Sequence, residues 1–174
     1  MVKALTFLTS TAAAVLFSFS VQATTLDDAA IMAIFDQANM ADITTARLGL
    51  KKAQAPEVRA LARMVLTDHE AVQQMGRDLA KKQGIVALPP DGDTSLTAQA
   101  EAYARLQAKS GGEFDRAYLA HEVAFHQGVI DAIKESLLPA IADPEFKALV
   151  TKVLPGFEHH LAETKKVAAH LGMN

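Results

Sequence analysis

The chain has 174 residues, with 17 lysine and arginine against 20 aspartate and glutamate side chains and a formal net charge of −3 at pH 7. This mild acidity argues against the basic face that nucleic-acid binding requires, so we expect no nucleic-acid partner. The sequence has no cysteine, which excludes disulfides, thiolate metal sites and cysteine nucleophiles. Any metal site must therefore use histidine, aspartate, glutamate or tyrosine.

The first residues have the layout of a signal peptide. Lys3 supplies a basic start, an apolar stretch covers residues 4–19, and Val21-Gln22-Ala23 forms a cleavage site before Thr24. The apolar stretch is too short and too rich in serine and threonine for a membrane span of ~20 residues. We therefore expect removal of residues 1–23, a periplasmic or secreted domain over residues 24–174, and no membrane span in the mature chain.

The mature chain predicts helices throughout, because apolar residues recur at spacings of three and four. Proline- and glycine-rich breaks separate the helices, and the clearest loop covers residues 85–93. The expected helices are residues 27–54, 56–83, 94–110, 113–138 and 143–170, and Pro155 is expected to kink or divide the last one. Four long helices and one short one predict an all-α fold: a ferritin-like, up-and-down four-helix bundle with one additional short helix.

Each long helix carries an ionisable residue in the middle of its predicted apolar seam. The first helix has Asp42, the second His69, the third Glu122 and His126, and the fourth His160. An unpaired buried polar group costs ~1–3 kcal/mol, so four such helices suggest that these side chains meet one another. Imidazoles and carboxylates suit one divalent transition-metal ion (Fe, Zn, Cu or Mn), and bundle interiors commonly hold such sites.

The metal-ligand candidates are therefore Asp42, His69, His126 and His160, with Tyr118, Glu122 and Asp68 as less favoured neighbours. An alternative is a non-catalytic structural, interaction or stress-related bundle, in which these polar residues only fix helix packing through hydrogen bonds. On the third helix, Tyr118, His121 and Phe125 form a competing inward stripe. No serine has an evident base beside it, so we predict no catalytic residue. The sequence identifies no protein partner.

Four segments, in this order, carry a family resemblance: residues 64–69, 114–119, 126–127 and 154–161. They resemble a bacterial family of exported proteins, the domain of unknown function 4142, which is placed in the ferritin-like superfamily. The resemblance implies a helical bundle and no defined activity. It matches the family's Asp-His pair to Asp68-His69, its Phe-Asp-x-x-Tyr motif to Phe114–Tyr118, its later histidines to His126 and His160, and its first-helix acidic residue to Asp42.

The Glu-x-x-His motif of di-iron members of the ferritin-like superfamily does not occur in this sequence. Glu122 and His126 are four residues apart, and His160 precedes Glu163 by three, which reverses the motif. The departure argues against a standard di-iron oxidase or ferroxidase. It favours a site for a single metal ion with histidine and carboxylate ligands, or no metal site.

Overall fold

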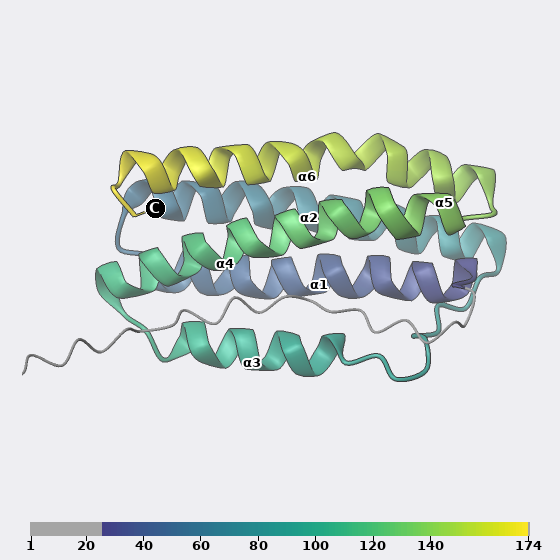
Figure 1. Ribbon diagram of the computed structural model, residues 1–174, viewed down its shortest axis with the longest axis horizontal. Helices are drawn as coiled ribbons and strands as arrows, with labels where there is room; N and C mark the ends of the chain where they lie inside the picture. The colour runs from purple at the N-terminus through teal and green to yellow at the C-terminus, as the bar shows by residue number, and fades with distance from the viewer. Residues whose placement is uncertain (1–25, 174) are drawn as a thin grey trace, which may run out of the picture.

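The computed structural model describes residues 26–173 and shows long helices lying side by side along the molecule (Figure 1). The elements are α1 (Asp28–Lys52), α2 (Pro56–Gln83), α3 (Ser95–Gln107), α4 (Gly111–Ala132), the π-helical turn η1 (Ile133–Leu137), α5 (Leu138–Ala140) and α6 (Pro144–His170). The predicted all-α bundle with one additional short helix, α3, is confirmed. The expected signal peptide, residues 1–23, lies outside the described residues.

The chain builds the bundle from two antiparallel pairs, α1 with α2 and α4 with α6 (Figure 1). The crossover between the pairs, residues 84–110, returns along the bundle and carries α3, which contacts α1 and α4. As a result α2 and α4 run in the same direction, and the alternation of directions holds within each pair only. One long crossover is the connectivity of ferritin-like bundles.

The helix ends follow capping chemistry. The Asp27 carboxylate accepts the Ala30 N–H at 2.8 Å, and the Asp143 carboxylate accepts the Phe146 N–H at 2.7 Å, so both helix starts satisfy a free donor. Gly84, directly after α2, takes the left-handed conformation with φ of 68° that glycine favours at this position. These local signals explain why the predicted boundaries of α2 agree with the structure.

The two internal prolines have different effects. Ahead of Pro139 the helix widens into η1, where the Leu138 N–H bonds to the Ile133 carbonyl, and helical structure continues to Ala140, beyond the predicted end at residue 138. A widened turn accommodates a ring that cannot donate to the preceding turn. In contrast, α6 runs through Pro155 without interruption, so the expected division of this helix does not occur.

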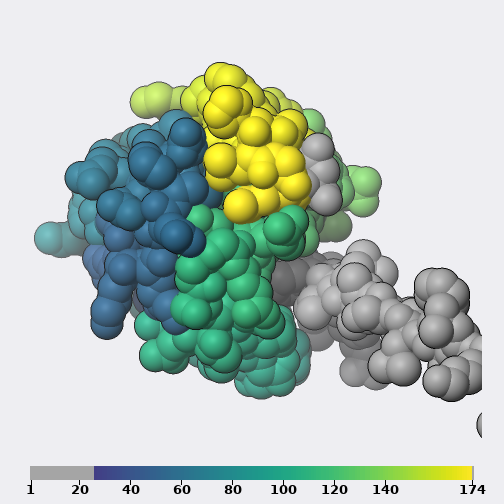
Figure 2. Space-filling view, turned by 90° about the vertical axis from the view of Figure 1, so that its left-hand side faces the viewer, coloured from purple at the N-terminus to yellow at the C-terminus, as the bar shows by residue number. Residues whose placement is uncertain are grey.

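Two hydrophobic clusters fill the bundle, one toward each end. The first includes Val58, Ala62, Val65, Phe114 and Leu119, and the second includes Ile31, Phe35, Ile130, Phe146 and Phe157. Figure 2 views the first end, where the start of α2, the start of α4 and the end of α6 pack together. Buried polar side chains from the middle of the long helices lie between the clusters, so apolar packing holds them away from water at both ends.

Gly49 permits a close approach of α1 to α2 and α4. A Cβ atom at this position would lie 2.9 Å from the Ala62 Cβ and 3.0 Å from the Tyr118 ring. Gly49→Ala is therefore expected to lower the free energy of unfolding by about 1–3 kcal/mol, although alanine is the better helix former by about 1 kcal/mol. Urea denaturation measures the change.

Gly156→Ala is the matched control, because a Cβ at this position in α6 meets nothing within 4 Å. This variant is expected to gain up to about 1 kcal/mol of stability from its helix preference. Equal gains in both variants would show that the close approach at Gly49 is not tight.

Candidate metal centre

The four candidate ligands come from four different helices and meet in the middle of the bundle. Asp42 lies on α1, His69 on α2, His126 on α4 and His160 on α6, and all four are buried. One ring nitrogen from each of the three histidines lies within 4.8 Å of the others. The Asp42 Oδ2 atom lies 3.0 Å from His69 Nε2 and 3.2 Å from His126 Nε2. The structure therefore brings together the residues that the sequence singled out.

Asn39, which the sequence analysis did not select, fixes the orientation of His69. Its Nδ2 group donates to the Phe35 carbonyl at 2.8 Å, which leaves its Oδ1 as an acceptor 2.9 Å from His69 Nδ1. The proton of neutral His69 therefore lies on Nδ1, and the lone pair of Nε2 is directed toward Asp42.

The other two histidines are oriented in the same way by groups outside the cluster. His126 Nδ1 lies 3.0 Å from the backbone carbonyl of Glu122, and His160 Nε2 lies 2.9 Å from Asp68 Oδ2. Both partners accept, so these nitrogens carry the protons. Metal-binding histidines characteristically donate their second ring nitrogen to a carbonyl or carboxylate in this manner.

The remaining polar atoms of the cluster have no hydrogen bond. They are Nε2 of His69 and His126, Nδ1 of His160, and both carboxylate oxygens of Asp42. When the imidazoles are neutral, all are acceptors in a buried space, an arrangement that costs free energy unless a proton or a metal cation lies among them. Two donors bound to one tetrahedral ion lie about 3.4 Å apart, close to the observed separations of 3.0 and 3.2 Å.

The protonation states also suit a cation. Burial lowers the pKa of His126, and burial lowers the pKa of His160 to about 4 against the opposing effect of Asp68. These imidazoles are therefore neutral near pH 7, the form that binds metals. Burial by itself raises the pKa of Asp42, but positive charge on His126 and His69, together with a hydrogen bond from His69, outweighs it and holds that pKa below its usual range. The cluster thus presents neutral nitrogens of His126 and His160 beside a carboxylate anion that stabilises positive charge among them.

Glu122 and Tyr118 lie beside the cluster. Glu122 joins Asp42 and His126 in a second group of ligand atoms within 4.8 Å of one another, and neither its oxygens nor the Tyr118 hydroxyl meets a hydrogen-bond partner. Burial, and then the Asp42 carboxylate, raise the pKa of Glu122 well above its usual value, which favours its protonated form. Burial likewise raises the pKa of Tyr118. Asp68, whose side chain is 51% exposed, supports His160 from the surface.

Asp115, the acidic residue of the Phe-Asp-x-x-Tyr motif, has a structural role that sequence reasoning missed. It is 1% exposed, and its two carboxylate oxygens accept the backbone N–H groups of Gln54 at 2.9 Å and Ala55 at 2.7 Å. Gln54 and Ala55 lie in the connection between α1 and α2, so these hydrogen bonds join the start of α4 to that connection. No pattern in the sequence reveals this contact, because 60 residues separate Asp115 from Ala55.

Both inward stripes proposed for the third long helix contain buried residues. Leu119, Glu122 and His126 are buried in the bundle, and so are Tyr118 and Phe125 of the competing stripe. His121 is half-buried and lines a cavity on the side of α3. The helix is covered on both flanks because α3 packs against it from outside the four-helix core.

Comparisons with known proteins found one structure of similar fold and one matching family. A crystal structure of a DUF305 fragment from Deinococcus radiodurans has the same helical fold, with a TM-score of 0.68 and 18% sequence identity over 80% of this chain and 96% of that one. A search of curated proteins found no match. Within residues 26–173, no helix combines the length and apolarity needed to cross a membrane. The model of the domain of unknown function DUF4142 matches residues 17–167, and the chain belongs to that family.

Proposed function

We propose that this chain is an exported protein that binds one divalent transition-metal ion through His69, His126, His160 and Asp42. The observation that carries the proposal is the shared arrangement of the three buried histidines. Each uses one ring nitrogen to donate to a fixed acceptor and directs the other into the space that they share. Asp42 lies at hydrogen-bond distance from His69 and His126 in that space, whereas a closed packing network would also give Nδ1 of His160 a partner, which it lacks.

The ligand set favours holding a metal over catalysing a reaction. Three imidazoles and one carboxylate supply four ligands, which completes a tetrahedral sphere such as that of a structural zinc site. The ligands come from four helices and each is at most 2% exposed, so bound metal would link the helices and exchange slowly. Imidazole-rich sites accept Zn, Fe and Cu, and the carboxylate also suits Mn.

Metal analysis of the protein, purified without chelator from its own compartment, tests the proposal. We expect about one equivalent of metal per chain. After chelation, titration with Co²⁺ is expected to give one tetrahedral absorption spectrum that saturates at one equivalent. His126→Ala should abolish it, whereas His159→Ala should not, because His159 is exposed beside His160. Absence of both native metal and Co²⁺ binding, or saturation unchanged in His126→Ala, would overturn the proposal.

Export is the second part of the proposal, and the signal-like layout of residues 1–23 supports it. Expression of the full chain in a bacterial host is expected to give a periplasmic product whose N-terminus is Thr24, as measured by mass spectrometry. Ala23→Lys should block processing, because the residue before the cut must be small. Gln22→Lys is the control and should be processed normally; an unprocessed wild-type chain in the cytoplasm would contradict export.

A further inference from the structure

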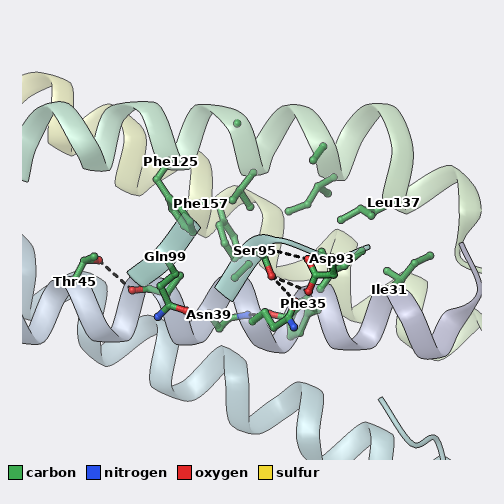
Figure 3. A pocket seen from close by; sticks show the side chains of 18 of the residues that line it. Ile31, Phe35, Asn39, Thr45, Asp93, Ser95, Gln99, Phe125, Leu137 and Phe157 are labelled. Carbon is green, nitrogen blue, oxygen red and sulfur yellow. Dashed lines mark hydrogen bonds between the residues drawn. The ribbon is translucent and has the colours of Figure 1, made fainter. Parts of the chain in front are cut away.

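A second feature of the bundle, a cavity on the side of α3, is separate from the metal ligands. It has a volume of about 90 Å³ and lies among α1, α3, α4, η1 and α6 (Figure 3). Its wall follows α1 from Thr45 at one end to Ile31 at the other, a helical length of about 21 Å. The cavity is therefore long and narrow.

The wall is mainly apolar and lacks a positive charge. Its inner part consists of aliphatic and aromatic side chains such as Phe35, Ile133 and Leu137, and no lysine or arginine among residues 26–173 lines it. Asp93 lies on the wall, but its carboxylate accepts from the Ser95 N–H at 3.0 Å and the Ser95 hydroxyl at 2.9 Å. An anionic ligand would lose its hydration and meet this carboxylate without gaining a counter-charge.

The end near Thr45 differs from the rest because polar groups reach the wall there. Gln99 of α3 lies at this end in Figure 3, and His121 lies on α4 one turn before Phe125, which is also at this end. Within residues 26–173, neither the Gln99 side-chain amide nor the His121 ring has a hydrogen-bond partner. Together they offer both donors and acceptors, whereas Ile31 and Leu137 form the opposite, apolar end.

We propose that this cavity binds a small uncharged molecule with a slender apolar body and one hydrogen-bonding end, of the class of medium-chain alcohols. The hydroxyl lies toward Gln99 and His121, and the hydrocarbon part lies along α1 toward Leu137. A dry apolar cavity of about 150 Å³, larger than this one, is known to hold a benzene-sized ligand. The proposal does not depend on metal binding, since the cavity is built largely from other residues.

Gly128 gives a direct way to fill the cavity. It lines the wall, and a Cβ at this position meets no atom within 4 Å. The side chain of Gly128→Leu would therefore enter open space at the cavity wall without a clash at its Cβ. Gly156→Leu introduces the same side chain in the middle of α6, at an exposed position where a Cβ also meets nothing. The two variants differ in the cavity alone.

The experiment is calorimetric titration of the purified full chain, in chelator, with 1-butanol, 1-hexanol and 1-octanol. We expect saturable binding of one molecule per chain that tightens by about fourfold per added methylene group. Octanoate should bind at least tenfold more weakly than 1-octanol. Gly128→Leu should weaken octanol binding at least tenfold, and Gly156→Leu should leave it unchanged.

Uptake that does not saturate, or equal octanol affinity in Gly128→Leu and the wild type, would overturn the proposal. Equal affinity for octanoate would overturn the uncharged class of ligand. If Gly128→Leu does not fold, as judged by circular dichroism, Ala132→Phe serves in its place, since Ala132 also lines the cavity. Repeating the titration with metal-loaded protein shows whether alcohol binding is independent of metal binding.

Discussion

Asp42→Asn is expected to abolish metal binding while leaving the metal-free protein at least as stable as the wild type. The substitution removes the one anionic ligand, and affinity for Co²⁺ should fall by more than about 100-fold, beyond the effect of losing an outer partner. With neutral imidazoles in the metal-free wild type, Asp42 Oδ2 faces nitrogen lone pairs of His69 and His126 at 3.0 and 3.2 Å. An amide at this position can donate to His69 or His126, so we expect a gain of about 1–2 kcal/mol in unfolding free energy.

The sign of the stability change separates a metal centre from a packing network. If the contacts of Asp42 with His69 and His126 were ion pairs that hold the helices in register, removing the carboxylate would cost about 3–5 kcal/mol. Urea denaturation in the presence of chelator measures the difference. A loss of that size would favour the structural alternative over the metal-binding proposal.

Asp115→Asn is the matched control, because Asp115 is a carboxylate of the same type and nearly the same burial. Both of its oxygens accept backbone N–H groups, so its loss should destabilise the protein by about 2–4 kcal/mol. Metal affinity should stay unchanged, since Asp115 lies at the end of α4 away from His126. The two variants thus compare Asp115, a carboxylate that stabilises the fold, with Asp42, a carboxylate that binds the metal ion.

The sequence predicted the fold well because its signals are local. The proline at the start of α2, the glycine after it and the aspartate before α6 all act within one helical turn, and each helix boundary lies close to them. The course of the crossover was not predictable in this way. The return of α3 along the bundle involves its packing against α1 and α4 and a hydrogen bond from the Leu88 N–H to the Ala29 carbonyl, and these contacts join residues far apart in the sequence.

The ligand candidates were predictable because helical periodicity places Asp42, His69, His126 and His160 on inward seams. The groups that orient them were less visible. Asn39 precedes Asp42 by three residues and belongs to the same face of α1, yet an asparagine near a seam is common and gives no specific signal. Its role depends on an atomic contact with a residue 30 positions away, and contacts of that kind require the packed structure.

Asn39→Leu is expected to weaken metal binding by about 10–100-fold, the usual effect of losing an outer partner of a metal-binding histidine. Leucine cannot accept the His69 Nδ1 proton, so the ring would no longer be held with its Nε2 lone pair toward Asp42. The ¹⁵N chemical shifts of the His69 ring report this directly. They should show the Nδ1–H tautomer in the metal-free wild type and a mixture of tautomers in the variant.

Asp68→Ala is the comparison for Asn39→Leu, because Asp68 plays the same part for His160 from the protein surface. Its side chain is 51% exposed, so water can take over the hydrogen bond from His160 Nε2, and the affinity for Co²⁺ should fall only a few-fold. The loss of affinity should be larger in Asn39→Leu because Asn39 is 0% exposed, so no water can replace its carbonyl oxygen. Equal losses in both variants, with the His69 tautomer unchanged, would mean that Asn39 acts through packing and does not position the ligand.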